Sequence, residues 1–334
     1  MKNWSKLAAL LLTLAIALSF AACSPKTPAP TPTPEAQQSE TPVNIMALNG
    51  TTGFGMAKLI NDANQDESGY TCTVESDASN VTAALINGTT DIAALPTNAA
   101  AVVYNKTNGG VQLLALNTLG VLYLVTNDTV SVTSFEDLKG QTVYVPAQNP
   151  TFIFQYLCAQ NGLTVGEDVI IDNTYAQPAD LRTAVASGEV AVAVLPEPMV
   201  TIAKAANDKL TTALDLTAEW DRVSPAGSLV QGCVVVRTEF VKEHPDEIAQ
   251  FLEAYSASID YLTSGEEDVG AVIENTGIFT KGAVAVKAIP NCNLCFITGQ
   301  EMQTAMSAYL EIMHDAAPES IGGKLPGDDF YYIG

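Results

Sequence analysis

The pattern of apolar and polar positions in this chain repeats at a spacing of 100 residues, so that residues 43–98 correspond to residues 143–198 without a gap. Each copy predicts a strand, a polar loop, a helix, a second strand, another loop, a helix that ends at a glycine, and a third strand that ends at a proline. The match is closest in the last part, where Gly88 corresponds to Gly188. Element order and spacing agree along the whole span. We therefore interpret the copies as two small α/β lobes and not as chance similarity between alanine-rich stretches.

Two such lobes form a ligand cleft when they face each other. Parallel strands carry ligand-binding loops at their carboxyl ends, so a facing pair encloses a space between those loops. Apolar runs over residues 121–126 and 229–237 flank the second copy and predict the strands that cross between the lobes. The predicted fold is therefore α/β and two-lobed, with a ligand cleft between lobes joined by two crossing segments. The predicted lobe one comprises residues 43–126 plus 229–334, and lobe two comprises residues 127–228.

Helices are predicted for most of the chain after residue 237. One covers residues 245–263, with proline in its first turn, and another covers residues 299–316. The second has an apolar stripe at helical spacing, which is more typical of core packing than of a cofactor site. The stripe consists of Met302, Met306, Tyr309, Leu310 and Met313. Further upstream, Ser134 and Asp137 form a variant of the capping box that opens a short helix.

The first 42 residues predict export and membrane anchoring. Lys2 and Lys6 precede a predominantly apolar run over residues 7–20, which is too short to span a bilayer and indicates a signal peptide over residues 1–22. The segment LSFAAC, which ends at Cys23, resembles a bacterial lipobox, with phenylalanine where leucine is expected. We therefore expect a lipidated Cys23, a disordered proline-rich tether over residues 23–42, and an extracytoplasmic location with a lipid anchor to the bacterial membrane.

Charge narrows the range of partners. The formal net charge is −22 at pH 7, and no basic stripe runs along the sequence. Such a surface repels phosphate backbones and anionic lipid headgroups. Nucleic acid is therefore excluded as a partner, as is membrane contact beyond the lipid, and we expect a monomer.

The cysteines after Cys23 offer little chemistry. They are Cys72, Cys158, Cys233, Cys292 and Cys295, an odd number that cannot all pair within one molecule. A metal site at the close pair Cys292 and Cys295 would need further ligands that no neighbouring His or Cys supplies, and a redox pair would be expected at a helix start. A local disulfide or two buried thiols remain as the interpretations of this pair.

Several segments together resemble the substrate-binding lipoproteins of ABC importers. These are the lipobox, the proline-rich stalk, and residues 134–146 (SFEDLKGQTVYVP), 188–198 (GEVAVAVLPEP) and 240–247 (FVKEHPDE). The branch that is most similar serves nitrate, sulfonates, taurine and thiamine-pyrimidine precursors, and the resemblance covers nearly the whole mature chain. It implies a type II periplasmic-binding-protein fold, closure of the lobes on a solute, and delivery to a membrane permease driven by a separate ATPase.

The loops that follow the paired strands are the candidate ligand-binding site. Most lead into helix N-termini, whose free backbone N–H groups can hold an acceptor atom. The candidate ligand-binding residues are Asn49, Thr51, Thr52, Phe54, Asp77, Ser79, Thr97, Asn98, Asn149, Thr151, Phe152, Tyr175, Gln177 and Glu197. The shift of 100 residues predicts that Thr51 and Asn98 face Thr151 and Glu197 across one pocket. For any single polar residue, helix capping is an equally good explanation, and for the aromatic residues it is core packing.

The candidate loops contain no Lys or Arg. A sulfonate or nitrate could be held only by helix ends and by Thr, Ser and Asn donors, with Asp77 and Glu197 nearby carrying the wrong charge. The loops therefore favour a neutral, zwitterionic or weakly cationic solute. A heterocycle stacked on Phe54, Phe152 or Tyr175 would fit such loops.

Enzymatic function is the main competing class, because fold does not determine function. The two histidines, His244 and His314, lie in the C-terminal region away from the candidate loops. No metal spacing, phosphate loop or nucleophile elbow is found in the sequence, so we expect no cofactor, no metal and no catalytic residue. Asp77 and Glu197 as a catalytic carboxylate pair is a less economical interpretation than capping. A lipoprotein that senses a solute stays open as an alternative to a transport component.

Overall fold

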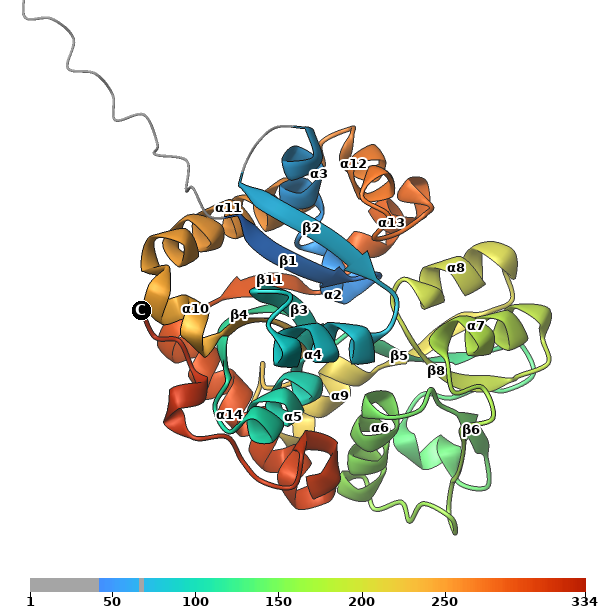
Figure 1. Ribbon diagram of the computed structural model, residues 1–334. Coiled ribbons are helices and arrows are strands. Elements are labelled where there is room, and N and C mark those ends of the chain that lie inside the picture. Colours follow the sequence, from blue (N-terminus) through green and yellow to red (C-terminus); the bar gives the residue numbers. More distant parts are fainter. Residues whose placement is uncertain (1–41, 66–68) are drawn as a thin grey trace, which may run out of the picture. The chain divides into compact units, whose positions relative to one another are not determined.

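The computed structural model describes residues 42–65 and 69–334, which form two mixed β-sheets with helices packed against them (Figure 1). The first sheet has six strands in the order β11-β4-β10-β3-β1-β2. Strand β1 is parallel to β2 and β3, whereas β10 is antiparallel to both β3 and β4, and β11 is antiparallel to β4. Its strands are β1 (Val43–Leu48), β2 (Tyr70–Glu75), β3 (Ile92–Pro96), β4 (Val111–Leu119), β10 (Val230–Arg237) and β11 (Leu294–Ile297).

The second sheet has five strands in the order β7-β6-β8-β5-β9. Strand β6 is parallel to β7 and β8, and β5 is antiparallel to β8 and β9. Its strands are β5 (Leu122–Thr126), β6 (Thr142–Tyr144), β7 (Ile170–Asp172), β8 (Val192–Pro196) and β9 (Thr211–Asp215).

The internal repeat has a structural counterpart. The order β2-β1-β3 in the first sheet matches β7-β6-β8 in the second, and in each sheet an antiparallel strand follows. Helices α4 (Ala78–Asn87) and α7 (Pro178–Ser187) start at equivalent positions and end at Gly88 and Gly188, with φ of 72° and 82°. Both glycines adopt the left-handed conformation that closes a helix most easily without a side chain.

The two apolar runs predicted to cross between the lobes form strands β5 and β10, and each of these strands pairs within a single sheet. Strand β5 pairs with β8 and β9, so a division of the chain by sheet falls at Gly120 and Val121, before the predicted boundary at residue 126. A Cβ atom at Gly120 would lie 2.1 Å from Thr217 Oγ1, so a side chain there would clash. An apolar run predicts a buried strand but does not say which sheet it joins. The assignment of residues to two lobes stays a prediction.

The helices cover the faces of the sheets (Figure 1). Helices α11 (Pro245–Thr263) and α14 (Gly299–Ala316) have the predicted bounds, and the apolar stripe of α14 is fully buried, as core packing requires. The other helices are α2 (Thr51–Phe54), α3 (Ala57–Gln65), α5 (Thr97–Thr107), α6 (Asn149–Gln160), α8 (Met199–Ala206), α9 (Leu216–Val223), α10 (Thr238–Glu243), α12 (Val269–Asn275) and α13 (Gly282–Ala288). Short 3-10 helices are η1 (Phe135–Leu138), which Ser134 and Asp137 cap as predicted, η2 (Ile289–Asn291), η3 (Pro318–Ile321) and η4 (Asp328–Phe330). Within the described residues, no helix has both the length and the apolar character needed to cross a membrane.

The largest apolar cluster draws side chains from both sheets. Leu95 and Leu116 of the first sheet belong to the same buried cluster as Leu124 and Val194 of the second. Trp220 of α9 belongs to this cluster and is 0% exposed. Its ring packs against Tyr156 and Tyr309 at centroid distances of 4.8 and 6.0 Å, and its Nε1 donates to Ser228 Oγ at 2.8 Å.

A partly buried ion pair connects three strands of the first sheet at one end. The Asp91 carboxylate, just before β3, accepts a hydrogen bond from Arg237 Nη2 at 2.7 Å. The same carboxylate accepts from the Asn44 backbone N–H at 2.9 Å and from Asn44 Nδ2 at 3.1 Å. Arg237 also lies 3.6 Å from Glu239, which is 83% exposed. Asp91 therefore connects β1 and β10 at the start of β3.

The cysteines of the described residues are all free thiols. Cys292 is buried and Cys295 half-buried, so of the two interpretations of this pair the structure favours thiols over a local disulfide. Burial raises the pKa of Cys295 to about 12, and it also raises the pKa of Cys292, with a smaller contribution from Glu197. Such thiols stay protonated at neutral pH and are poor nucleophiles. No group of three or more His, Cys, Asp or Glu in the described part of the chain could hold a metal ion.

The predicted signal peptide, Cys23 and the tether up to residue 41 lie outside the described residues.

Candidate functional site

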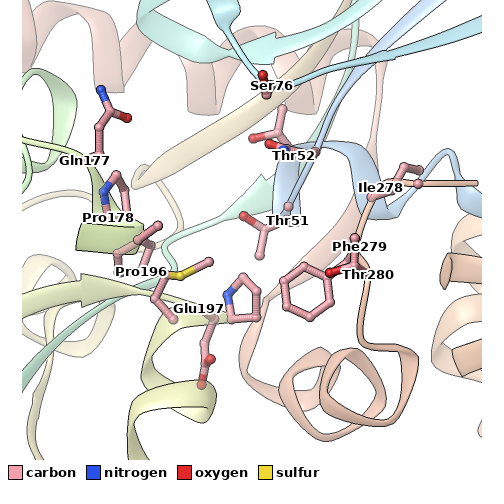
Figure 2. A pocket seen from close by; sticks show the side chains of 16 residues that line it. Thr51, Thr52, Ser76, Gln177, Pro178, Pro196, Glu197, Ile278, Phe279 and Thr280 are labelled. Atoms are coloured by element: carbon pink, nitrogen blue, oxygen red, sulfur yellow. The ribbon is translucent and has the colours of Figure 1, made fainter. Parts of the chain in front are cut away.

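A cavity of about 480 Å³ is lined by loops from both sheets (Figure 2). Its first-sheet wall comes from the β1–α2 loop, the end of β2 and the α12–α13 loop, and its second-sheet wall comes from the starts of α7 and α8. The lining residues are Asn49, Gly50, Thr51, Thr52, Ser76, Gln177, Pro178, Ala179, Pro196, Glu197, Pro198, Met199, Gly277, Ile278, Phe279 and Thr280.

The β1–α2 loop is held in place by backbone geometry. Gly50 has φ of 83°, a conformation that favours glycine, and its N–H donates to the Ile278 carbonyl at 3.0 Å. A Cβ atom at Gly53 would lie 1.8 Å from the Leu48 carbonyl oxygen, so only glycine fits this close approach. Asn117 Nδ2 of β4 donates to the Thr52 carbonyl at 3.0 Å. These contacts fix α2 so that Thr51 and Thr52 line the cavity.

The α12–α13 loop supplies the aromatic surface of the cavity. The Phe279 ring faces the cavity beside Thr51 (Figure 2) and packs edge-on against Phe54, at a centroid distance of 6.0 Å and an angle of 79°. Sequence reasoning missed this loop because it treated the region after residue 237 as helical. The available signal was Gly277, an interruption in the helical pattern that has φ of 74°, two residues before an aromatic side chain.

The backbone of Glu197 forms part of the cavity wall, whereas its carboxylate points away from the cavity. The residue follows β8, is 3% exposed and precedes Pro198 through a cis peptide bond. Its carboxylate accepts from the Thr201 N–H at 3.1 Å and from Thr201 Oγ1 at 3.0 Å, and it points away from Thr51 and Phe279 in Figure 2. Burial raises the pKa of Glu197, and hydrogen bonds from Thr201 and Asn291 oppose that rise. Among the described residues that line the cavity, Glu197 is the only one with an ionisable side chain.

Some of the residues predicted for the site lie together around the cavity. Asn49, Thr51, Thr52, Gln177 and Glu197 line the cavity. Predicted Phe54 lies behind Phe279 and is fully buried, as expected for core packing. A ligand-binding role for these residues stays a prediction, which the shared cavity favours.

Other predicted residues serve the alternative roles of capping and surface contact. The Asp77 carboxylate caps α4 by accepting from the Ser79 N–H at 2.8 Å, and this hydrogen bond lowers the pKa of Asp77. The Tyr175 hydroxyl donates to Glu189 Oε1 at 2.7 Å. Phe152 lies on α6, outside the cavity lining. The capping alternative therefore describes Asp77, and Ser79 supplies the backbone N–H that this cap satisfies.

The remaining predicted residues lie outside the cavity lining. Asn149 Oδ1 accepts from the Tyr309 hydroxyl at 2.7 Å, and Thr151 Oγ1 donates to the Pro146 carbonyl at 2.8 Å. Thr97 Oγ1 donates to the Val230 carbonyl at 2.7 Å, and the neighbouring Asn98 has a buried Oδ1.

Of the four residues expected to face one another, Thr51 and Glu197 line the cavity, whereas Asn98 and Thr151 lie outside its lining. The Thr151 hydroxyl bonds within its own loop to the Pro146 carbonyl, and the neighbouring Asn149 bonds to Tyr309 of α14, whose ring packs against Trp220 of α9.

Comparison with known proteins identifies a family for this chain. The profile of the family described as NMT1/THI5 like matches residues 71–267, which is more than half of the chain. No sequence among the curated proteins matches significantly. Solved structures with sequence identities below 25% share the fold over most of their length. At such identities the similarity extends to the fold and not to a specific function.

An ABC transporter protein from Parabacteroides distasonis aligns with a TM-score of 0.73 and 24% identity, over 88% of this chain and 99% of that one. The periplasmic aliphatic sulphonate binding protein from Escherichia coli aligns with a TM-score of 0.70 and 13% identity, over 85% and 96%. The periplasmic nitrate-binding protein from Synechocystis PCC 6803 aligns with a TM-score of 0.59 and 12% identity, over 84% of each chain. The predicted α/β fold of two lobes is thereby confirmed, and the chain belongs to the NMT1/THI5-like family.

Proposed function

We propose that this protein is the extracytoplasmic solute-binding component of an ABC importer, which holds a small organic solute between its two lobes and delivers it to a membrane permease with a separate ATPase. The observation that carries the proposal is the cavity whose walls come from both sheets, most of them at loops that follow parallel strands. The family match and the transport and binding functions named for the similar structures support it. The protein acts as a binding protein and not as an enzyme, and as a monomer.

The chemistry of the cavity favours an uncharged, zwitterionic or weakly cationic solute. Its polar side chains are amides and hydroxyls, including Asn49, Thr51 and Thr280, and it has no Lys or Arg among the described residues. Its apolar surface is the Phe279 ring with prolines and Met199, a surface suited to a flat heterocycle. We therefore assign to Phe279 the stacking role that the sequence suggested for Phe54, Phe152 or Tyr175. A sulfonate or nitrate would depend on helix ends and hydroxyl donors alone.

A thermal-shift screen tests the proposal. The panel comprises vitamins, pyrimidines, sulfonates, nitrate, amino acids and polyamines, and we expect one uncharged, zwitterionic or cationic class to raise the melting temperature. A solute at about 100 times its dissociation constant adds roughly 2.7 kcal/mol of stability. Isothermal calorimetry on each responding compound then measures the dissociation constant.

Two variants connect that binding to the cavity. Phe279→Ala, which removes the ring from the cavity wall, should weaken binding roughly tenfold or more, whereas Phe152→Ala, which removes a ring outside the lining, should leave the dissociation constant unchanged. A protein that responds to no compound class contradicts the proposed function. Tight binding to sulfonates or nitrate alone contradicts the charge argument and leaves the transport proposal standing.

The anchor is a second part of the proposal. We expect Cys23→Ala to block processing by the lipoprotein signal peptidase or to release the protein from the membrane, because the lipid on Cys23 is the membrane attachment that we propose. Membrane fractionation and metabolic labelling with a fatty acid measure this. Recovery of a labelled, fully membrane-bound Cys23→Ala protein would refute the lipid anchor, and Cys72→Ala serves as the matched control that keeps the anchor.

A further inference from the structure

The uncharged polar side chains of the cavity lie almost all on its first-sheet wall, beside the Phe279 ring. They are Asn49, Thr51, Thr52, Ser76 and Thr280. On the second-sheet wall, Gln177 is the only uncharged polar side chain among the described residues, and the Glu197 carboxylate points away from the cavity (Figure 2). The rest of that wall is apolar and consists of Pro178, Ala179, Pro196, Pro198 and Met199.

The polar side chains of the first-sheet wall are available to a solute. Within the described residues, none of their hydroxyl or amide groups takes part in a hydrogen bond, because the contact of Thr52 with Asn117 uses the Thr52 backbone carbonyl. Such groups are hydrated until a solute replaces the water. Asparagine, threonine and serine side chains can each donate and accept. This wall therefore matches a solute edge that has donors and acceptors but no charge.

The internal repeat offers a comparison of the same positions in the second copy. Thr151, the counterpart of Thr51, donates its hydroxyl to a carbonyl of its own loop at 2.8 Å. Asn149, the counterpart of Asn49, accepts from the Tyr309 hydroxyl at 2.7 Å. The same two residue types thus bond within the protein in one copy and face the cavity unbonded in the other.

Two further positions differ in the residue itself. The counterpart of Thr52 is Phe152, and the counterpart of Ser76 is Ala176, neither of which has a polar side chain. The polar character of the first-sheet wall is therefore a property of the first copy and not of the repeated fold.

We propose that the solute has its hydrogen-bonding groups along one edge, which the first-sheet wall binds, and an apolar opposite edge, which the second-sheet wall covers. This proposal rests on the proposed solute-binding function and deepens it to a class of solute. A ring between the two edges contacts Phe279. Gln177 then determines specificity, because a polar group on the opposite edge has only this amide to bond to on the described second-sheet wall.

Isothermal calorimetry with three small probes tests the polar edge. Benzamide carries an amide at one edge of an apolar ring, N,N-dimethylbenzamide keeps the ring but has no amide donor, and acetamide keeps the amide but has no ring. We expect benzamide to bind roughly tenfold tighter than either of the others, because one control loses two donors and the other loses the apolar surface of the ring.

The internal repeat supplies a matched pair of variants. Thr51→Val removes the hydroxyl, keeps a similar shape, and should weaken benzamide binding by roughly twofold to tenfold. Thr151→Val makes the same change at the counterpart outside the lining and should leave the dissociation constant of benzamide unchanged. Melting curves of both variants verify that they fold.

The role of Gln177 is tested with 4-hydroxybenzamide, which adds a hydroxyl opposite the amide. Gln177→Leu should weaken the binding of 4-hydroxybenzamide by roughly twofold to tenfold more than it weakens the binding of benzamide. Equal effects on the two compounds would contradict the specificity role of Gln177.

Equal binding of benzamide and N,N-dimethylbenzamide, or wild-type affinity in Thr51→Val, would overturn the proposal and leave solute binding in place. The proposal also fails alone if the thermal-shift screen identifies a solute and benzamide does not bind. Probes that bind as expected in a protein that responds to no compound class of the screen would support the two different walls and refute the proposed function.

Discussion

Trp220→Ala is expected to lower the free energy of unfolding by about 3 to 5 kcal/mol, the usual cost of removing a large aromatic side chain from a core. Trp220 is 0% exposed and belongs to the apolar cluster shared by both sheets. Its removal leaves a cavity beside Tyr156 and Tyr309 and leaves Ser228 without its indole partner. Urea denaturation followed by far-UV circular dichroism measures the loss, since the variant lacks the tryptophan that fluorescence would follow.

Trp220→Phe is the matched control. It keeps an aromatic ring between Tyr156 and Tyr309 but removes the indole N–H, so we expect a smaller loss, on the order of 1 to 3 kcal/mol. A loss below about 1 kcal/mol for Trp220→Ala would mean that the two sheets do not depend on this packing, in conflict with the shared cluster.

Asp91→Ala is expected to lower the free energy of unfolding by about 2 to 4 kcal/mol, because it removes the buried carboxylate that pairs with the partly buried Arg237 and leaves that guanidinium with the exposed Glu239 as its ion-pair partner. The Asp91 side chain is 8% exposed and Arg237 is 22% exposed, and Arg237 Nε is buried without a hydrogen-bond partner among the described residues. The change also removes the acceptor for both nitrogens of Asn44. Thermal and urea unfolding at neutral pH measure the effect.

Glu239→Ala provides the comparison within the same cluster. Glu239 lies 3.6 Å from the same Arg237 but is 83% exposed, so its loss should cost no more than about 1 kcal/mol. Equal losses for Asp91→Ala and Glu239→Ala would show that burial does not determine the strength of these pairs and would refute the prediction.

Local signals in the sequence predicted the elements well. Pro245 in a first turn and the stripe from Met302 to Met313 determine helices whose bounds agree with α11 and α14. Gly88 and Gly188 end equivalent helices because few other residues adopt their conformation. Each of these signals involves residues only a few positions apart, so it can be recognised in the sequence without knowledge of the tertiary fold.

Which residues line the cavity depends on tertiary contacts that local signals in the sequence do not predict. The stripe on α14 indicates that Tyr309 is buried, but not that it packs against Asn149 and Trp220. Asn98 and Thr151 lie outside the cavity lining, whereas Phe279, more than 200 positions further along the chain than Thr51, belongs to it. A repeat of 100 residues could predict only loops that belong to the repeat, and the α12–α13 loop does not.

The unequal distribution of strands along the chain has a consequence for how the protein forms. All strands of the five-stranded sheet lie between residues 122 and 215, so that sheet is complete in a chain that has emerged only to this point. The six-stranded sheet is then still divided, because β10, which begins at Val230, lies between β3 and β4. While the chain emerges from its N-terminus, β3 and β4 therefore have unpaired edges until β10 follows, and these edges can pair with other chains.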